Sequence, residues 1–292
     1  MISGVLVVDK PAGLTSHGVV ARVRKSLGIR KVGHAGTLDP DATGVLVLGV
    51  GQATRLLGHL AASDKEYSST FVLGCSTTTD DAAGETVSWS SAANLDPVRV
   101  RDAMTAFVGD ILQRPSSVSA VKVDGQRAYD LVRAGRDVDL PPRPVSVDAF
   151  DLLALRPDTR DGHDVVIVDV AVHCSAGTYV RALARDLGEA LGVGGHVETL
   201  RRTRSGSFRA EEAVPLAEVE ESTPLLTPAE AVRRSMPYEV IDEESAALAR
   251  HGVQIPWPGE APGVLTAFLC GSELVGLGEE VRGRTVWTAV FS

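Results

Sequence analysis

The sequence predicts an α+β fold with a mixed, mostly antiparallel sheet flanked by helices. Short strand-like runs alternate irregularly with amphipathic helical runs, unlike the regular strand–helix repeat of a parallel sheet. Two strand-like segments, residues 148–155 and 165–172, are joined only by the polar segment 156–164 and predict a hairpin. The chain has 292 residues, of which 44% are hydrophobic, so it can bury a substantial core.

The N-terminal part of the chain predicts strands around one helix. Thr15-Ser16 precedes an amphipathic run over residues 17–27 that ends at Gly28, which is the pattern of a helix with a polar start and a glycine end. Apolar and β-branched runs predict strands at residues 4–8, 45–48 and 67–73.

Two further helices are predicted in the middle of the chain. The first covers residues 97–107. The second starts at Thr178 and closes at Gly192, because its apolar residues recur at helical spacing. These residues are Val180, Leu183, Ala184, Leu187 and Leu191.

The composition changes sharply near residue 210. An acidic, proline-containing stretch, residues 211–235, is expected to connect a first domain, residues 1–210, to a small β-rich module, residues 236–292. The module is expected to contain one helix, at 243–251, and four strands, at 238–241, 264–269, 274–278 and 285–291.

Composition and cysteine usage exclude several classes of protein. No apolar run approaches the roughly 18 to 20 residues needed to cross a bilayer, and the first residues lack the pattern of a signal peptide. Cys75, Cys174 and Cys270 form no CxxC pair, which favours buried thiols over disulfides or a zinc site. We therefore expect a cytoplasmic monomer with no membrane partner and no metal.

The net charge of −9 is unevenly distributed along the chain. Residues 1–209 contain 24 basic and 24 acidic residues, whereas residues 210–292 contain 5 basic and 14 acidic ones. Within the neutral part, basic residues gather in 1–34 and 181–209. Such patches suit phosphate binding, although ordinary solvated surfaces have a similar composition.

Chemically suggestive residues gather in the segment 33–44, GHAGTLDPDATG, just before a predicted strand. Its three glycines permit positive φ and a close approach of the backbone to a ligand, and Pro40 keeps Asp39 out of the helical region. His34 lies five residues before this carboxylate. The segment predicts a functional loop; the alternative is a turn in which Asp39 and Thr43 bond their own backbone.

Five motifs follow one another over the first two hundred residues. They are DKPAGLTS at 9–16, GHAGTLDPDATGVL at 33–46, KEY at 65–67, SAVK to RAY over 119–129, and CSAGTYVR at 174–181. In these motifs the chain resembles the TruB-type tRNA pseudouridine synthases, which isomerise uridine 55 in the T-arm of tRNA. The resemblance covers residues 1 to about 209 and implies the pseudouridine synthase fold, with a thumb-like insertion at about 114–143. The later part of the chain, residues 236–292, resembles a PUA-like RNA-binding domain.

The resemblance implies three catalytic residues. Asp39 matches the family's catalytic aspartate, and Arg181 matches a cation that clamps this carboxylate and holds its pKa down. Tyr67 matches a tyrosine that stacks on the flipped uracil and is a candidate general base for loss of a C2′ proton. No cofactor is implied. Attack on C1′, attack on C6 of the base and elimination to a glycal all remain open.

The resemblance also implies residues that bind the substrate. His34 matches a histidine that stacks into the gap left in the RNA, while Asp81, Tyr179 and Leu200 match positions that contact or enclose the uracil. Asp80 is adjacent to Asp81, so either carboxylate could match this family position, and we assign the position to Asp81. The first motif is expected to support the active-site loop.

The segment 114–143 holds six basic residues against four acidic ones and matches the thumb that closes on the T-loop. Lys122 and Arg133 are the cations expected to contact RNA there. Residues 115–118, PSSV, depart from the family pattern, in which a second proline and an aromatic residue are common. The acidic module at 236–292 is expected to assist RNA binding only weakly.

Two other functions fit many of these features. A non-catalytic tRNA-binding chaperone would use the same basic surface and pocket, but it has no need for a carboxylate among phosphates, so Asp39 argues against it. A guide-RNA-dependent synthase of the dyskerin type would need protein partners, and its long basic extensions do not occur in this sequence. We therefore expect an enzyme that acts on the tRNA T-arm without an obligate protein partner.

Overall fold

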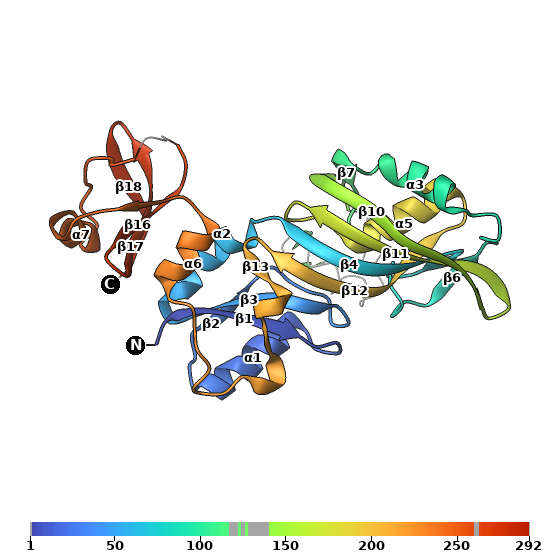
Figure 1. Ribbon diagram of the computed structural model, residues 1–292, viewed down its shortest axis with the longest axis horizontal. Helices are drawn as coiled ribbons and strands as arrows, with labels where there is room; N and C mark the ends of the chain where they lie inside the picture. The colour runs from blue at the N-terminus through green and yellow to red at the C-terminus, as the bar shows by residue number, and fades with distance from the viewer. Residues whose placement is uncertain (1, 117–121, 124–125, 128–139, 260–262, 292) are drawn as a thin grey trace. The chain divides into compact units, whose positions relative to one another are not determined.

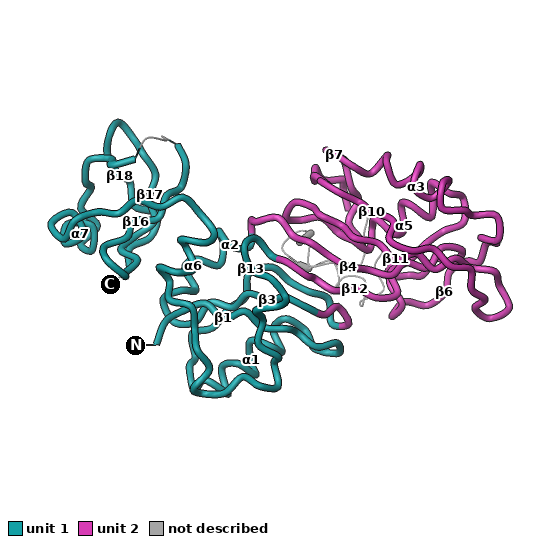
Figure 2. The backbone as a smooth tube through the Cα atoms, in the orientation of Figure 1, with its two compact units in different colours: residues 1–40, 44–61, 205–292 teal, residues 41–43, 62–204 magenta. Residues whose placement is uncertain are grey.

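The computed structural model describes residues 2–116, 122–123, 126–127, 140–259 and 263–291. The chain forms two compact units (Figure 2), of which unit 1 contains residues 1–40, 44–61 and 205–292, and unit 2 contains residues 41–43 and 62–204. The C-terminal residues therefore group with the N-terminal strands. The domain boundaries expected near residues 210 and 235 stay a prediction.

Unit 1 starts with strands and with helix α1, which packs against them (Figure 1). Strands β1 and β2 both pair antiparallel with β3, and the short β14 pairs parallel with β1. The elements are β1 (Gly4–Lys10), α1 (Ser16–Leu27), β2 (Val32–Ala35), β3 (Thr43–Val50), the 3-10 helix η1 (Gly51–Leu56), α2 (Leu57–Ala61) and β14 (Val214–Pro215).

Helix α1 forms where its end signals predict it. The Thr15 hydroxyl accepts the backbone N–H of Gly18 at 2.9 Å, and Gly28 ends the helix in the left-handed region with φ of 65°. Its apolar face is buried in one cluster with the strands β1 and β3. The buried apolar residues of the helix are Val19, Val20, Val23 and Leu27.

The rest of unit 1 comes from the C-terminal third of the chain. Helix α6 (Pro228–Ser235) lies inside the stretch that the composition predicts to be a connection, and the reciprocal bonds of Thr227 and Glu230 cap its start. A four-stranded sheet of order β15-β16-β17-β18 follows. The remaining elements are β13 (Phe208–Arg209), η2 (Ala210–Glu212), η3 (Leu216–Glu218), β15 (Tyr238–Val240), α7 (Glu243–Arg250), β16 (Thr266–Cys270), β17 (Glu273–Val281) and β18 (Arg284–Val290).

Unit 2 is built on strands in the order β12-β4-β11-β10-β7, with helices α3 and α5 packed on them through a buried core. Two short ribbons, β5 with β6 and β8 with β9, lie outside this sheet. The elements are β4 (Lys65–Leu73), β5 (Cys75–Thr77), β6 (Thr86–Trp89), α3 (Pro97–Thr105), β7 (Gly109–Gln113), β8 (Lys122–Val123), β9 (Gln126–Arg127), β10 (Arg143–Arg160), β11 (His163–Cys174), α5 (Val180–Leu191) and β12 (Gly195–Ser205).

The hairpin of β10 and β11 is longer than the sequence predicts. Pairing continues to Arg160 opposite His163, so the prediction of a polar connection over 156–164 is wrong. Only Asp161 and Gly162 turn the chain, with φ of 49° and 80°. Two successive residues with positive φ match the twist of the strands, and the polar side chains beside them are exposed strand residues.

These pairings confirm the predicted fold class. Among the described residues most strand pairs are antiparallel, while β1–β14 and β15–β16 are parallel. The three cysteines are free and buried, as their spacing predicts. In the described ranges no helix has the length and apolar character needed to span a membrane.

Candidate active site

The loop between β2 and β3 carries Asp39 and is fastened on both sides of this residue. The Ser16 hydroxyl donates to the carbonyl of Leu38 at 3.0 Å and accepts the N–H of Leu38 at 2.9 Å. The ammonium of Lys10 donates to the carbonyl of Pro40 at 2.7 Å. Because the side chains of Ser16 and Lys10 are both buried, the backbone of Asp39 is held between two interior polar anchors. The contact of Lys10 confirms that the first motif supports the loop.

Glycines permit the path of this loop. Gly36 and Gly44 have φ of 91° and 99°, a region that side-chain-bearing residues rarely adopt. In the segment 33–44, positive φ is therefore confirmed at Gly36 and Gly44 but does not occur at Gly33. Asp39 itself is half-buried, a position in which a carboxylate is partly shielded from water.

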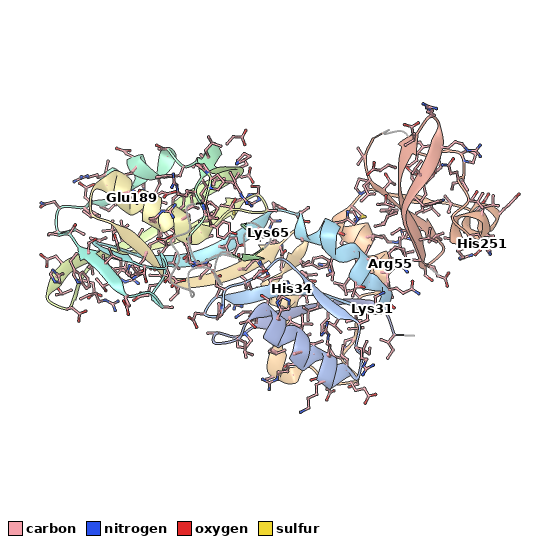
Figure 3. The ribbon with its side chains drawn as sticks, turned by 180° about the vertical axis from the view of Figure 1, so that it is seen from behind. Lys31, His34, Arg55, Lys65, Glu189 and His251 are labelled. Atoms are coloured by element: carbon pink, nitrogen blue, oxygen red, sulfur yellow. The ribbon has the colours of Figure 1, made fainter. Side chains whose placement is uncertain are left out.

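His34 lies on β2, five residues before Asp39 (Figure 3). It is half-buried, and its ring meets the ring of His17 edge to face, with the centroids 5.1 Å apart. Unit 1 therefore offers a pair of flat rings near the loop.

In unit 2, Tyr67 and Leu200 lie on the neighbouring strands β4 and β12. Both side chains are partly buried and pack against the same apolar core. The Ser69 hydroxyl donates to the carbonyl of Thr199, which ties the two strands together beside these residues. An aromatic ring and an aliphatic side chain thus lie at the margin of one core, an arrangement that suits stacking of a flat base.

Tyr179 precedes helix α5 and is fixed by Gln113, the last residue of β7. The N–H of Tyr179 donates to Oε1 of Gln113 at 2.8 Å, and Nε2 of Gln113 donates back to the carbonyl of Tyr179 at 3.1 Å. Gln113 is only 2% exposed, so these bonds are shielded from water. The sequence patterns do not predict Gln113, because its partner lies 66 residues away.

Arg181, in the first turn of α5, is buried beside Asp81. Its Nη1 donates to Oδ2 of Asp81 at 3.2 Å and to the carbonyl of Thr79 at 2.9 Å. Asp81 also accepts the N–H of Ala83 at 3.1 Å. The structure thus joins two of the predicted site residues within unit 2. Asp39 belongs to unit 1, and its predicted pairing with Arg181 stays a prediction.

A second arginine–aspartate pair lies one helical turn further along α5. Nη1 of Arg185 lies 3.1 Å from Oδ2 of Asp80, and Nη2 donates to the carbonyl of Arg114 at 2.8 Å. Burial raises the pKa of the neighbouring Asp186 carboxyl, although the guanidinium of Arg185 opposes this shift. The sequence patterns do not predict this pair, because Arg185 and Asp80 are 105 residues apart.

The structure describes only one of the two predicted thumb cations. Lys122 belongs to β8, whose backbone pairs with β9 so that Lys122 lies opposite Arg127. Arg133 lies outside the described residues. Their roles in RNA binding stay predictions.

A cluster of ionisable groups surrounds the start of β4, two residues before Tyr67. Hydrogen bonding to Arg204 lowers the pKa of Asp64 to about 2, with a further contribution from His173. Lys65, labelled in Figure 3, is 5% exposed, and burial lowers its pKa to about 8. Cys174 lies opposite Lys65 on β11, and burial raises the pKa of its thiol to about 11.

Replacing Lys65 by methionine is expected to change how stability depends on pH. The pKa of Lys65 is about 8 in the folded chain against an ordinary value of 10.5, so between these pH values the unfolded chain holds a proton that the folded chain has lost. The free energy of unfolding of the wild type therefore gains from this group as pH rises through that window, and Lys65→Met lacks the gain. Urea unfolding of both proteins across the window measures the difference, and a constant difference contradicts the prediction.

One cavity in the described residues does not involve the predicted site residues. A cavity of about 190 Å³ in unit 2 is lined by Cys75, Trp89 and His196, among others, and by none of the predicted site residues. Among the side chains that the structure describes, no group of three or more His, Cys, Asp or Glu residues could hold a metal ion.

Two protein-family models match consecutive parts of this chain. Residues 24–180 match the family model of the TruB family pseudouridylate synthase N-terminal domain. Residues 181–236 match the tRNA pseudouridylate synthase B C-terminal domain. Since the second match ends at residue 236, the PUA-like character of the last 56 residues stays a prediction.

Curated relatives match most of the chain. The tRNA pseudouridine synthase B of Corynebacterium efficiens is 53% identical over 85% of this chain and 82% of that protein. The tRNA pseudouridine synthase B of an Arthrobacter species is 47% identical over 100% of this chain and 97% of that protein.

Solved structures are also similar to this chain over nearly its whole length. An H/ACA RNP bound to a substrate RNA containing 2′-deoxyuridine matches with a TM-score of 0.72 and 28% identity, covering 99% of this chain and 85% of that one. A Cbf5-Nop10-Gar1 complex matches with a TM-score of 0.72 and 29% identity, covering 99% and 84%. The enzyme class predicted from the ordered motifs is confirmed, and the chain belongs to the TruB family of pseudouridylate synthases.

Proposed function

We propose that this enzyme converts uridine 55 in the T-arm of tRNA to pseudouridine, with Asp39 as its catalytic carboxylate. Relatives named tRNA pseudouridine synthase B support tRNA as the substrate. The observation that carries the proposal is the anchoring of the Asp39 backbone between the buried side chains of Ser16 and Lys10. A rigidly held carboxylate in a loop is what a reaction at a defined sugar or base atom requires.

The proposed reaction is an isomerisation. The bond from C1′ to N1 breaks, the uracil turns while it stays bound, and a bond from C1′ to C5 forms. The hydrogen on C5 leaves as a proton and N1 gains a proton, so atoms and electrons balance without an oxidant or a reductant. The anion of Asp39 would meet the sugar or the base during the detached stage.

The other predicted residues receive roles that fit their surroundings. Tyr67 and Leu200, at the margin of one core, would hold the flipped base between apolar surfaces. Asp81, held by Arg181, would present a fixed polar group to the uracil edge. His34, beside His17, would stack in the gap that the base leaves in the RNA.

We propose that the enzyme acts without a protein partner. One of the similar solved structures is a complex of Cbf5 with Nop10 and Gar1. However, relatives that match this chain over nearly their whole length carry the name of a tRNA pseudouridine synthase B. A cytoplasmic location and a monomeric state stay predictions.

The proposal is tested with a T-arm stem-loop that carries 5-tritiated uridines. We expect the purified protein to release tritium from this RNA in the presence of a chelator and without any added cofactor. A matched stem-loop with cytidine at position 55 is expected to bind and to release none. Binding of the first RNA without release would instead support the chaperone, and equal release from both RNAs would refute the choice of position 55.

A further inference from the structure

Arg185 joins three segments of unit 2 from one position on α5. Its Nη1 lies 3.1 Å from Oδ2 of Asp80, and its Nη2 donates to the carbonyl of Arg114 at 2.8 Å. The same guanidinium contacts Asp186 on its own helix, with Nη2 at 2.7 Å from Oδ1. The side chains of Arg185 and Asp80 are only 20% and 14% exposed, so little water screens the pair.

The turn that Arg185 holds is the one that carries Asp81. Asp80 has φ of 58°, an uncommon conformation for a residue other than glycine, which persists only where its surroundings fix it. The carbonyl of Asp80 accepts the N–H of Val197 at 3.0 Å, and the N–H of Ala82 donates to the carbonyl of Val197 at 2.9 Å. The backbone of the turn is thus attached to β12, and the arginines of α5 hold its two carboxylates.

The end of β7 is attached to the same helix by two consecutive residues. Gln113 binds both backbone groups of Tyr179, and the carbonyl of Arg114 accepts the bond from Arg185. Helix α5, the Asp80-Asp81 turn and the end of β7 therefore form one connected polar network. The guanidinium of Arg185 links the turn to Arg114, the residue that follows β7.

We propose that Arg185 is a positioning residue for pseudouridine formation, which keeps the Asp80-Asp81 turn in the geometry that directs Asp81 toward Arg181 and the base. Lysine could not replace it, because a single ammonium lacks the planar fork that reaches two acceptors in fixed directions. The inference rests on the proposed function, since its readout is the rate of pseudouridine formation. It assigns to Arg185 a role that is exerted through Asp80.

The test compares Arg185→Gln, Asp80→Asn and the double variant with the wild type on the T-arm stem-loop. Asparagine tolerates the left-handed conformation, so Asp80→Asn removes the charge without disturbing the turn. Arg99→Gln is the matched control: Arg99 also donates from Nη2 to a carbonyl of α5, that of Leu191 at 3.3 Å, but at the other end of the helix. Single-turnover rate, RNA dissociation constant and thermal midpoint are measured for each protein.

We expect the rate to fall about tenfold in Arg185→Gln and in Asp80→Asn, while RNA affinity stays within about twofold. The double variant should be at most about twofold slower than the slower of the two single variants, because both changes break the same link. Arg99→Gln should keep the wild-type rate.

The proposal is overturned if Arg185→Gln keeps a rate within about twofold of the wild type, or if the losses multiply in the double variant. An equal loss of rate in Arg99→Gln also overturns it, since that result assigns Arg185 only a general stabilising role. If Arg185→Gln does not fold, the rate of Asp80→Asn is the test, and a rate within about twofold of the wild type overturns the proposal. The wild-type rate tests the proposed function separately, so failure of that function is distinguishable from failure of this proposal.

Discussion

Asp39→Asn is expected to lower the single-turnover rate of pseudouridine formation by at least about 10³-fold. Asparagine has nearly the same shape, and the anchors of the loop, Ser16 and Lys10, bond to the backbone of the neighbouring residues. The loop should therefore keep its path while the anion required during the detached stage is lost. RNA affinity should change by no more than a few fold, because the side chain contributes one group to a large interface.

Asp41→Asn is the matched control for this change. Asp41 lies two residues further along the same loop and is exposed to solvent. The same loss of one negative charge there should leave the rate within about threefold of the wild type. If Asp41→Asn lost as much activity as Asp39→Asn, a general effect of loop charge would explain both results and the assignment of Asp39 would fail.

Arg181→Gln is expected to lower both stability and rate. Arg181 is 4% exposed, and its removal leaves the Asp81 carboxylate and the Thr79 carbonyl without this donor. Removing one member of a buried ion pair costs roughly 2–4 kcal/mol of unfolding free energy when the partner keeps some contact with water. The rate should fall about a hundredfold in the folded protein, since the proposed site would lose a fixed cation.

The double variant Arg181→Gln with Asp81→Asn separates the two effects. Removing the carboxylate as well relieves its uncompensated charge, so urea unfolding should show a double variant that is more stable than Arg181→Gln alone. Its rate should remain low, because neither charged group is present. Stability losses that simply add would contradict an interaction between the two side chains.

Local signals predict α1 and the loop between β2 and β3. Thr15 caps the start of the helix and Gly28 ends it, while glycines adopt the positive φ of the loop. Each feature is therefore determined by residues that are close in the chain. Local patterns do not predict strand β12, because its arginine-rich sequence does not resemble a buried strand. Arg202 is nevertheless only 1% exposed, and its burial depends on the surrounding fold and not on local preference.

The motifs predict the site residues and also the support of the active-site loop by Lys10, whereas only the structure identifies Gln113 and Arg185 as residues that hold the site. Ser16, beside the loop, bonds to Leu38 across 22 positions, and Arg185 bonds to Asp80 across 105. No periodicity or cap signal reports such distant pairs. The sequence therefore identifies side chains suited to chemistry, and tertiary structure identifies the side chains that orient them.

The most direct test of the proposed function maps pseudouridine at single-nucleotide resolution in a full-length, unmodified tRNA transcript. The transcript is incubated with the wild-type protein or with Asp39→Asn, and both proteins are first shown to bind it. We expect pseudouridine at position 55 with the wild type and at no position with Asp39→Asn. Pseudouridine at a different position, or its formation by Asp39→Asn at the wild-type rate, would contradict the proposed function.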